Sequence, residues 1–165
     1  RDSSVTGVQT CALPISLACL TAIVPVAFRE PQRLTSGAEM VGLARWFRNE
    51  GRVEEALLLM RQALQRPMSD PLVYETLWHV ADIERKLERH AAAVTVWTEL
   101  STIRNPWQAQ ALERLAIHYE HREKNLAMAF EMTLAAQVIE DSEALRKRAA
   151  RLQRKVTGPK SGRLL

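Results

Sequence analysis

The stretch MVGLARWF, residues 40–47, decides the fold of this chain. Its residues at relative positions 0, 3, 4 and 7 are Met, Leu, Ala and Phe, and this spacing places them on one face of a helix. The same spacing recurs 72 residues later in LERLAIHY, residues 112–119. It also recurs midway, in LWHVADIE, residues 77–84, where Glu84 takes the place of the aromatic residue. The sequence therefore predicts a repeat of about 36 residues.

We call the three residue sets above the first stripes. After a short break, each is followed by a second helical stripe of mostly apolar residues. The second stripes consist of Ala56, Met60 and Ala63, of Ala93, Trp97 and Leu100, and of Ala129, Thr133 and Ala136. The third stripe comes one residue late, which predicts an inserted residue in the turn 121–126. Gly51 is predicted to end the first helix in a left-handed conformation.

Helix starts are marked by capping chemistry. Ser36 with Glu39 is a candidate capping box. Asp70-Pro71 and Asn105-Pro106 each combine a side-chain acceptor with a proline, which suits the N-cap and the first helical position.

These paired stripes resemble the tetratricopeptide repeat, a helix-turn-helix unit of about 34 residues, over residues 37–140. The first unit carries most of the family signature, in residues 43–47, Gly51, Ala56-Leu57 and Ala63. The resemblance implies an all-α solenoid of about three repeats. An ordinary helical bundle is the alternative, but a bundle has no reason to restore residue type at a fixed offset.

The repeat region is predicted to occupy residues 36–156 and to end in a capping helix over Asp141–Val156. Leu145, Ala149 and Leu152 share one face of that helix with Val156. Residues 157–165 contain two glycines and a proline and are predicted to be a flexible tail.

Residues 1–15 look like the conceptual translation of a short-read sequencing adapter, so we expect them to be a disordered artefact and the natural chain to begin near Ser16. Residues 16–35 are predicted to be the stub of a truncated upstream domain, a short helix and a linker. That stub resembles the last helix of the ribonuclease H-like exonuclease domain of the YprB type, and Ile117–Arg122 looks like part of its helical repeat region. The resemblance implies a metal-dependent 3′-5′ exonuclease parent whose catalytic residues lie outside this fragment.

A membrane-anchored or secreted protein would require residues 1–15 to be genuine. With them, residues 12–28 form an uncharged, largely apolar run. Without them, the run covers only residues 17–28, about twelve residues, whereas roughly 20 are needed to span a bilayer. We therefore expect a cytoplasmic protein with no membrane partner.

Composition fits one folded, non-catalytic region. The chain has 165 residues, 47% hydrophobic and 25% charged, with only two cysteines. This length excludes a large multidomain enzyme, and two cysteines exclude a disulfide scaffold. His118 and His121 lie near Glu120 and Glu123, but the spacing is not HExxH, and we expect exposed helical histidines. No catalytic, cofactor or metal site is predicted, so the fragment is not expected to be an enzyme.

The tetratricopeptide resemblance implies that outward residues of the first helices line a groove for a protein or peptide segment, or for the missing upstream domain. The predicted groove residues are Arg45, Asn49, Trp78, Asp82, Arg85, Glu113, Ile117 and His121. Their mixed charges suit a peptide ligand.

The chain carries a net charge of +4, and the excess of basic residues is concentrated at its C-terminal end. From Ser142 onward there are eight Lys or Arg residues and one Glu. The predicted nucleic-acid contacts are Arg146, Lys147, Arg148, Arg151, Arg154 and Lys155. The alternative is a solvated capping helix whose cations lie near its C-terminus, where the macrodipole favours them.

Overall fold

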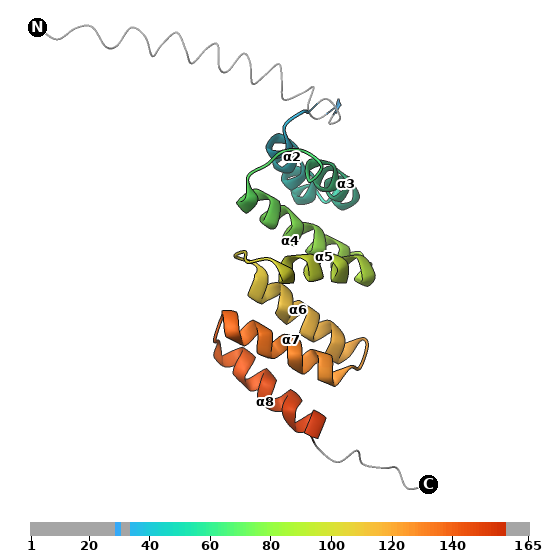
Figure 1. Cartoon of the computed structure of the whole chain (residues 1–165). Coiled ribbons are helices and arrows are strands. Elements are labelled where there is room, and N and C mark those ends of the chain that lie inside the picture. The colour runs from blue at the N-terminus through green and yellow to red at the C-terminus, as the bar shows by residue number, and fades with distance from the viewer. Residues whose placement is uncertain (1–28, 31–33, 158–165) are drawn as a thin grey trace, which may run out of the picture. The chain divides into compact units, whose positions relative to one another are not determined.

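The computed structural model describes residues 29–30 and 34–157, which contain seven helices, α2 to α8, and no strand (Figure 1). The prediction of an all-α chain is confirmed for these residues. The predictions for residues 1–15, for most of 16–35 and for 158–165 fall outside them. The chain divides into two compact units, Arg1–Met68 and Ser69–Leu165, and the predicted repeat region, 36–156, spans both.

The described helices of the first unit form a hairpin of α2 (Gly37–Asn49) and α3 (Val53–Ala63). Ala44, Ala56 and Ala63 are completely buried, so small side chains let the two helices approach closely. Gly37 is also tightly packed, because a Cβ atom there would lie 2.5 Å from Cγ of Met68 and 3.0 Å from the carbonyl oxygen of Ala63. A larger residue at position 37 would collide with Met68, which explains the glycine at the start of α2.

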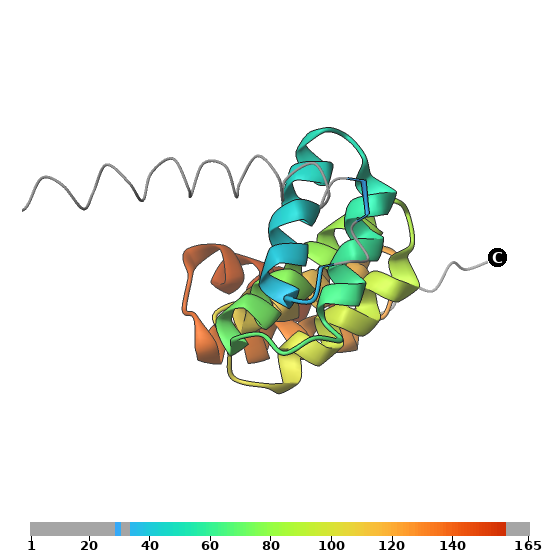
Figure 2. The same ribbon diagram turned by 90° about the horizontal axis from the view of Figure 1, so that it is seen from above.

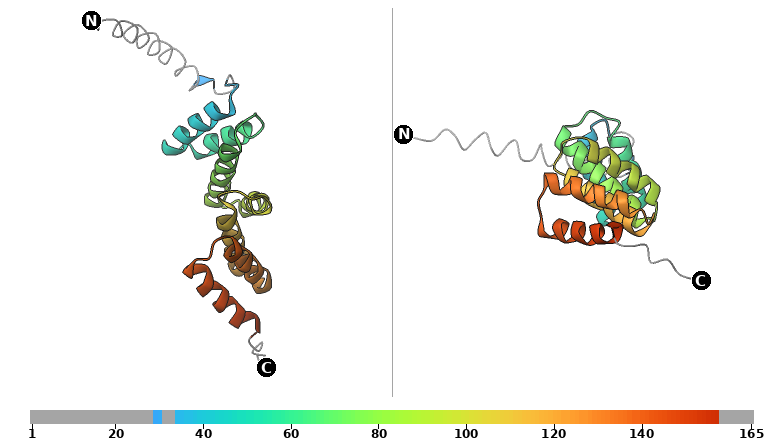
Figure 3. Two further views of the ribbon diagram at one scale, coloured as in Figure 1. Left: turned by 60° about the vertical axis from the view of Figure 1, so that its left-hand side comes forward. Right: turned by 60° about the horizontal axis from the view of Figure 1, so that its bottom comes forward.

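The second unit contains five helices, each of which packs on the next. They are α4 (Asp70–Lys86), α5 (His90–Thr102), α6 (Gln108–His121), α7 (Leu126–Ile139) and α8 (Glu143–Thr157). Their order can be followed by colour, from green to red, in Figures 2 and 3. The predicted capping helix is α8, which begins two residues later and ends one residue later than expected.

The predicted stripes form the core. All nine residues of the three second stripes are buried. The first stripes are buried as well, apart from Tyr119, which is half-buried. Glu84 is completely buried even though it replaces an aromatic residue, and its carboxylate lies 3.8 Å from the Arg89 guanidinium. The helical spacing therefore identified the core even where the residue type departs from the pattern.

The three hairpin turns share one backbone conformation. Gly51, Glu88 and Lys124 have φ angles of 79°, 60° and 57°, which is the left-handed region in each case. The prediction for Gly51 is confirmed. The two other turns place a residue with a side chain in the same conformation, which costs about 1–2 kcal/mol for an L-residue.

One backbone hydrogen bond closes each turn and reveals the inserted residue. The amide of Arg52 donates to the Phe47 carbonyl, and the amide of Arg89 donates to the Glu84 carbonyl, both at 2.9 Å and across five residues. In the third hairpin Asn125 donates to Tyr119 at the same distance but across six residues. The predicted insertion in the turn 121–126 is therefore confirmed.

Three helix starts differ from the predictions. Ser36 occupies the N-cap of α2, but its side chain makes no capping hydrogen bond, so the predicted capping interaction is wrong. The N-cap of α4 is Ser69, and Asp70 is already helical. Asn105 precedes α6 by three residues and acts in the connecting turn, because its Oδ1 accepts from the Trp107 amide at 2.8 Å while its Nδ2 donates to the Leu100 carbonyl at 2.7 Å.

Replacing Lys124 with glycine is expected to raise the free energy of unfolding by about 0.5–1 kcal/mol, because glycine adopts the left-handed conformation without strain. Urea denaturation followed by circular dichroism measures the change. Lys124→Ala removes the same side chain but keeps the strain, so it should give no gain. Equal stabilisation by both variants would contradict this explanation.

None of the helices in the described part of the chain is both long and apolar enough to cross a bilayer. The longest, α4, has 17 residues and carries several charges.

Candidate functional site

Six of the eight predicted groove residues lie on two helices of the second unit. Trp78, Asp82 and Arg85 occupy successive turns of one face of α4. Glu113, Ile117 and His121 occupy successive turns of one face of α6. The other two predicted residues, Arg45 and Asn49, belong to α2 in the first unit and lie one turn apart on that helix.

Trp78 contacts other parts of the second unit rather than standing free. Its ring stacks on Trp107, with centroids 5.1 Å apart and an interplanar angle of 11°. The Arg114 guanidinium lies 6.0 Å from the Trp78 centroid, at the outer limit of a cation–π contact. Trp78 therefore joins α4 to the start of α6, and both contact residues were missed by the sequence analysis.

Asp82 holds two cations on the surface of α4. It accepts from Arg85 at 2.7 Å and pairs with Lys86 at 2.9 Å. Partial burial by itself raises the pKa of Asp82, but the hydrogen bonds and charges of Arg85 and Lys86 outweigh it, and the pKa is lowered. Asp82 is therefore ionised at neutral pH and partly neutralises both neighbours.

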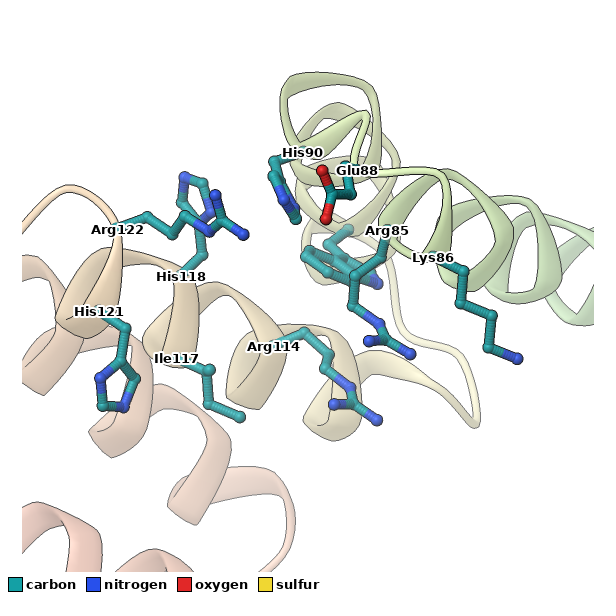
Figure 4. Close-up of a pocket in the computed structure, with 10 residues that line it drawn as sticks. Arg85, Lys86, Glu88, His90, Arg114, Ile117, His118, His121 and Arg122 are labelled. Atoms are coloured by element: carbon teal, nitrogen blue, oxygen red, sulfur yellow. The ribbon is translucent and has the colours of Figure 1, made fainter.

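A pocket of about 380 Å³ opens beside these residues (Figure 4). It contains three of the predicted groove residues, Arg85, Ile117 and His121. The pocket is completed by Lys86 on α4, Glu88 in the following turn, His90 and Trp97 on α5, and Arg114, His118 and Arg122 at α6. In Figure 4 the side chains of α4 and the following turn lie on the opposite side of the pocket from His118 and Arg122.

The pocket wall is strongly cationic. The wall contains four basic residues, Arg85, Lys86, Arg114 and Arg122, whereas Glu88 is its one acidic residue. Arg85 and Lys86 share Asp82, but Arg114 and Arg122 have no carboxylate within ion-pairing distance among residues 29–30 and 34–157. The wall therefore carries positive charge that the described chain does not neutralise.

Two carboxylates of α6 pair with the basic helix α8: Glu113, which lies 3.7 Å from Arg148, and Glu120. Glu120, only 2% exposed at its side chain, accepts from Arg151 at 2.7 Å, from Lys155 at 3.2 Å and from Arg148 at 3.3 Å. Arg148, Arg151 and Lys155 lie on one face of α8. Half of the predicted nucleic-acid contacts are thus engaged within the chain, an arrangement that the sequence analysis did not anticipate.

The remaining cations of α8 also have partners. Arg146 pairs with Asp141 at 3.1 Å, and Lys147 pairs with Glu143 at 2.7 Å. The Arg154 Nε donates to the carbonyl of Ala150 at 3.3 Å. Because the pairs of Arg146 and Lys147 are well exposed, they contribute little to stability and leave both cations accessible.

The electrostatic state of Glu120 follows from these contacts. Burial by itself raises its pKa, but the hydrogen bond from Lys155 and the charges of Arg151, Lys155 and His121 outweigh burial, so the pKa is lowered. Glu120 is therefore a carboxylate at neutral pH.

The two histidines of α6 differ in exposure. The side chain of His121 is 60% exposed, as expected, whereas that of His118 is 12% exposed and lies 3.1 Å from Glu123. The prediction that both are exposed is therefore wrong for His118, which faces the pocket. In the described ranges no group of three or more side chains is arranged to hold a metal ion.

The sequence matches neither the models of known protein families nor any of the curated proteins with which it was compared.

Proposed function

We propose that this chain is a non-catalytic interaction module, a solenoid of about three tetratricopeptide-like repeats that binds a protein or peptide segment. Support for the repeats comes from the turns. Their left-handed residues, Gly51, Glu88 and Lys124, follow one another at offsets of 37 and 36 residues. A recurring turn between recurring buried stripes is typical of repeat proteins, in which each unit is one supersecondary element.

The observation that carries the binding function is the pocket that α4 and α6 both line. Each is the first helix of its hairpin, and each presents one face of partly exposed side chains to the same pocket, with Arg85 on one side and Ile117 and His121 on the other. A pocket that two helices line with apolar and polar side chains suits a segment of an extended peptide.

A selection of random peptides displayed against the whole chain tests this function. Peptides that bind should lose at least tenfold in affinity with Ile117→Asp, because the substitution places a charge in the apolar part of the surface. The matched control is Ile139→Asp on α7, where the side chain is already 46% exposed, and it should bind as the unchanged protein does.

Affinity is measured by fluorescence polarisation, and folding of each variant by circular dichroism. If Ile117→Asp does not fold, Ile117→Ala takes its place in the affinity measurement, because it introduces no charge. The proposed function is wrong if no peptide is selected, or if both aspartate variants bind equally well.

The exonuclease parent stays a prediction. It is tested by reading the genomic DNA upstream of the Ser16 codon, where acidic exonuclease motifs are expected. The cytoplasmic location and the nucleic-acid contacts of α8 likewise stay predictions.

A further inference from the structure

We propose that the pocket between α4, α5 and α6 binds the terminal phosphate of a small phosphate monoester. The starting point is its unneutralised charge. Cations near the C-terminal ends of α4 and α6 have an ordinary structural explanation, since they offset the negative end of the helix dipole. That explanation fits Arg85, Lys86 and Arg122, but Arg114 lies in the middle of α6 and points to the same pocket in Figure 4.

Helix α5 strengthens the positive potential. His90 is the first residue of this 13-residue helix and lines the pocket, so the positive end of the helix dipole lies at the pocket wall. The N-cap residue Arg89 supplies no side-chain hydrogen bond to the first turn. An anion in the pocket would therefore meet a helix N-terminus as well as the guanidinium groups.

Two buried nitrogen atoms of the wall have no hydrogen-bond partner among the described residues. Trp97 is only 4% exposed, and its indole Nε1, which can only donate, has no hydrogen-bond partner among the described residues. The Nε2 atom of His90 is also buried without a partner. A buried donor left unpaired is unfavourable, so an acceptor oxygen that reaches the indole N–H of Trp97, or His90 Nε2 where it carries the proton, would recover free energy.

Phosphate fits this wall better than a carboxylate does. A phosphate monoester carries nearly two negative charges at neutral pH and three acceptor oxygens, and guanidinium groups bind it in a bidentate manner. The pocket volume of about 380 Å³ exceeds what a free phosphate ion fills and lies in the range of small-molecule sites. The geometry thus favours an organic phosphate over inorganic phosphate alone.

The site is tested on the whole chain with phosphoserine as the probe, titrated at constant ionic strength. Binding is measured by calorimetry and by the shift of the Trp97 indole N–H signal in NMR spectra, which is assigned with Trp97→Phe. We expect saturable binding and a shift at Trp97 but none at Trp46, which lies in the first unit. Inorganic phosphate should bind more weakly.

Variants locate the site. Arg114→Gln and Arg122→Gln should each weaken phosphoserine binding about tenfold, since a hydrogen bond to a charged group contributes about 1.5–3 kcal/mol. The matched control is Arg104→Gln, an exposed arginine in the turn after α5 that does not line the pocket. It should leave the affinity unchanged, and circular dichroism confirms that each variant folds.

Three results would overturn the proposal: no saturable binding of phosphoserine, unchanged binding by both pocket variants, or equal binding of dimethyl phosphate. Dimethyl phosphate is a diester with one charge, so equal binding would indicate a site for the nucleic-acid backbone instead. The proposal does not rest on peptide binding, because phosphoserine can bind in the pocket even if no displayed peptide is selected.

Discussion

Replacing Phe47 with alanine is expected to lower the free energy of unfolding by about 4 kcal/mol, because the side chain is among the largest that are fully buried. It lies on α2 with the Arg52 guanidinium 4.0 Å from its ring centroid and the Trp46 ring 5.6 Å away. Truncation leaves a cavity in the core of the α2–α3 hairpin. Urea denaturation followed by circular dichroism measures the loss.

The neighbouring Trp46→Ala is the matched control for Phe47→Ala. Trp46 is larger than Phe47 but 40% exposed, so its removal leaves little cavity and is expected to cost about 1 kcal/mol. If the two variants lost equal stability, burial in the α2–α3 hairpin would not be the source of the effect.

Replacing Glu120 with glutamine is expected to lower the free energy of unfolding by about 3 kcal/mol. The substitution keeps the shape of the side chain but leaves Arg151 and Lys155 without a countercharge, while Arg148 keeps only Glu113, at 3.7 Å. Removing one partner of a buried ion pair costs about 3–5 kcal/mol, and the partial exposure of Arg151 and Lys155 places the effect at the lower end. Hydrogen exchange should show the loss of protection first in α8.

The lowered pKa of Glu120 adds a pH dependence with a definite sign. Because the folded protein favours the ionised carboxylate, the stabilisation is complete above the ordinary pKa of 4.5 and is lost as pH falls through the lowered value. The unchanged protein should therefore lose this contribution only in acid, whereas Glu120→Gln lacks it at every pH.

Glu143→Gln is the matched control for Glu120→Gln. It removes an equal charge that pairs with Lys147 on α8, but both side chains are about three-quarters exposed. We expect a change within about 0.5 kcal/mol. Equal losses in both variants would mean that α8 is not held by the carboxylate of Glu120.

The core could be predicted from the sequence because it depends on local spacing. Residues such as Met40, Ala44 and Leu112 are buried because helical geometry alone places them on one face. The insertion before Asn125 could be predicted for the same reason, since it shifts the phase of the following stripe. The ion pair of Glu84 with Arg89 could not, because spacing places Glu84 in the core but does not identify its partner.

The candidate site could be predicted only in part because it depends on how hairpins meet. Arg85 and Ile117 were identified from their positions on first helices. Arg122 and His90 were missed, since they reach the pocket only when the end of α6 lies beside the start of α5. The contacts of α8 were missed for a similar reason: Glu120 lies 28 to 35 residues before its three cations.

Helix α7 is apolar on almost every side, with Leu134, Val138 and Ile139 already in contact with solvent. On one flank, Ala136 of α7 is buried in a cluster with Leu145 of α8 and Leu112 of α6. Salt screens ionic tethers far more than it weakens apolar packing. We therefore expect α8 to be the first helix to detach at high salt concentration. Its detachment would expose an apolar surface of α7, and aggregation would start from this C-terminal end.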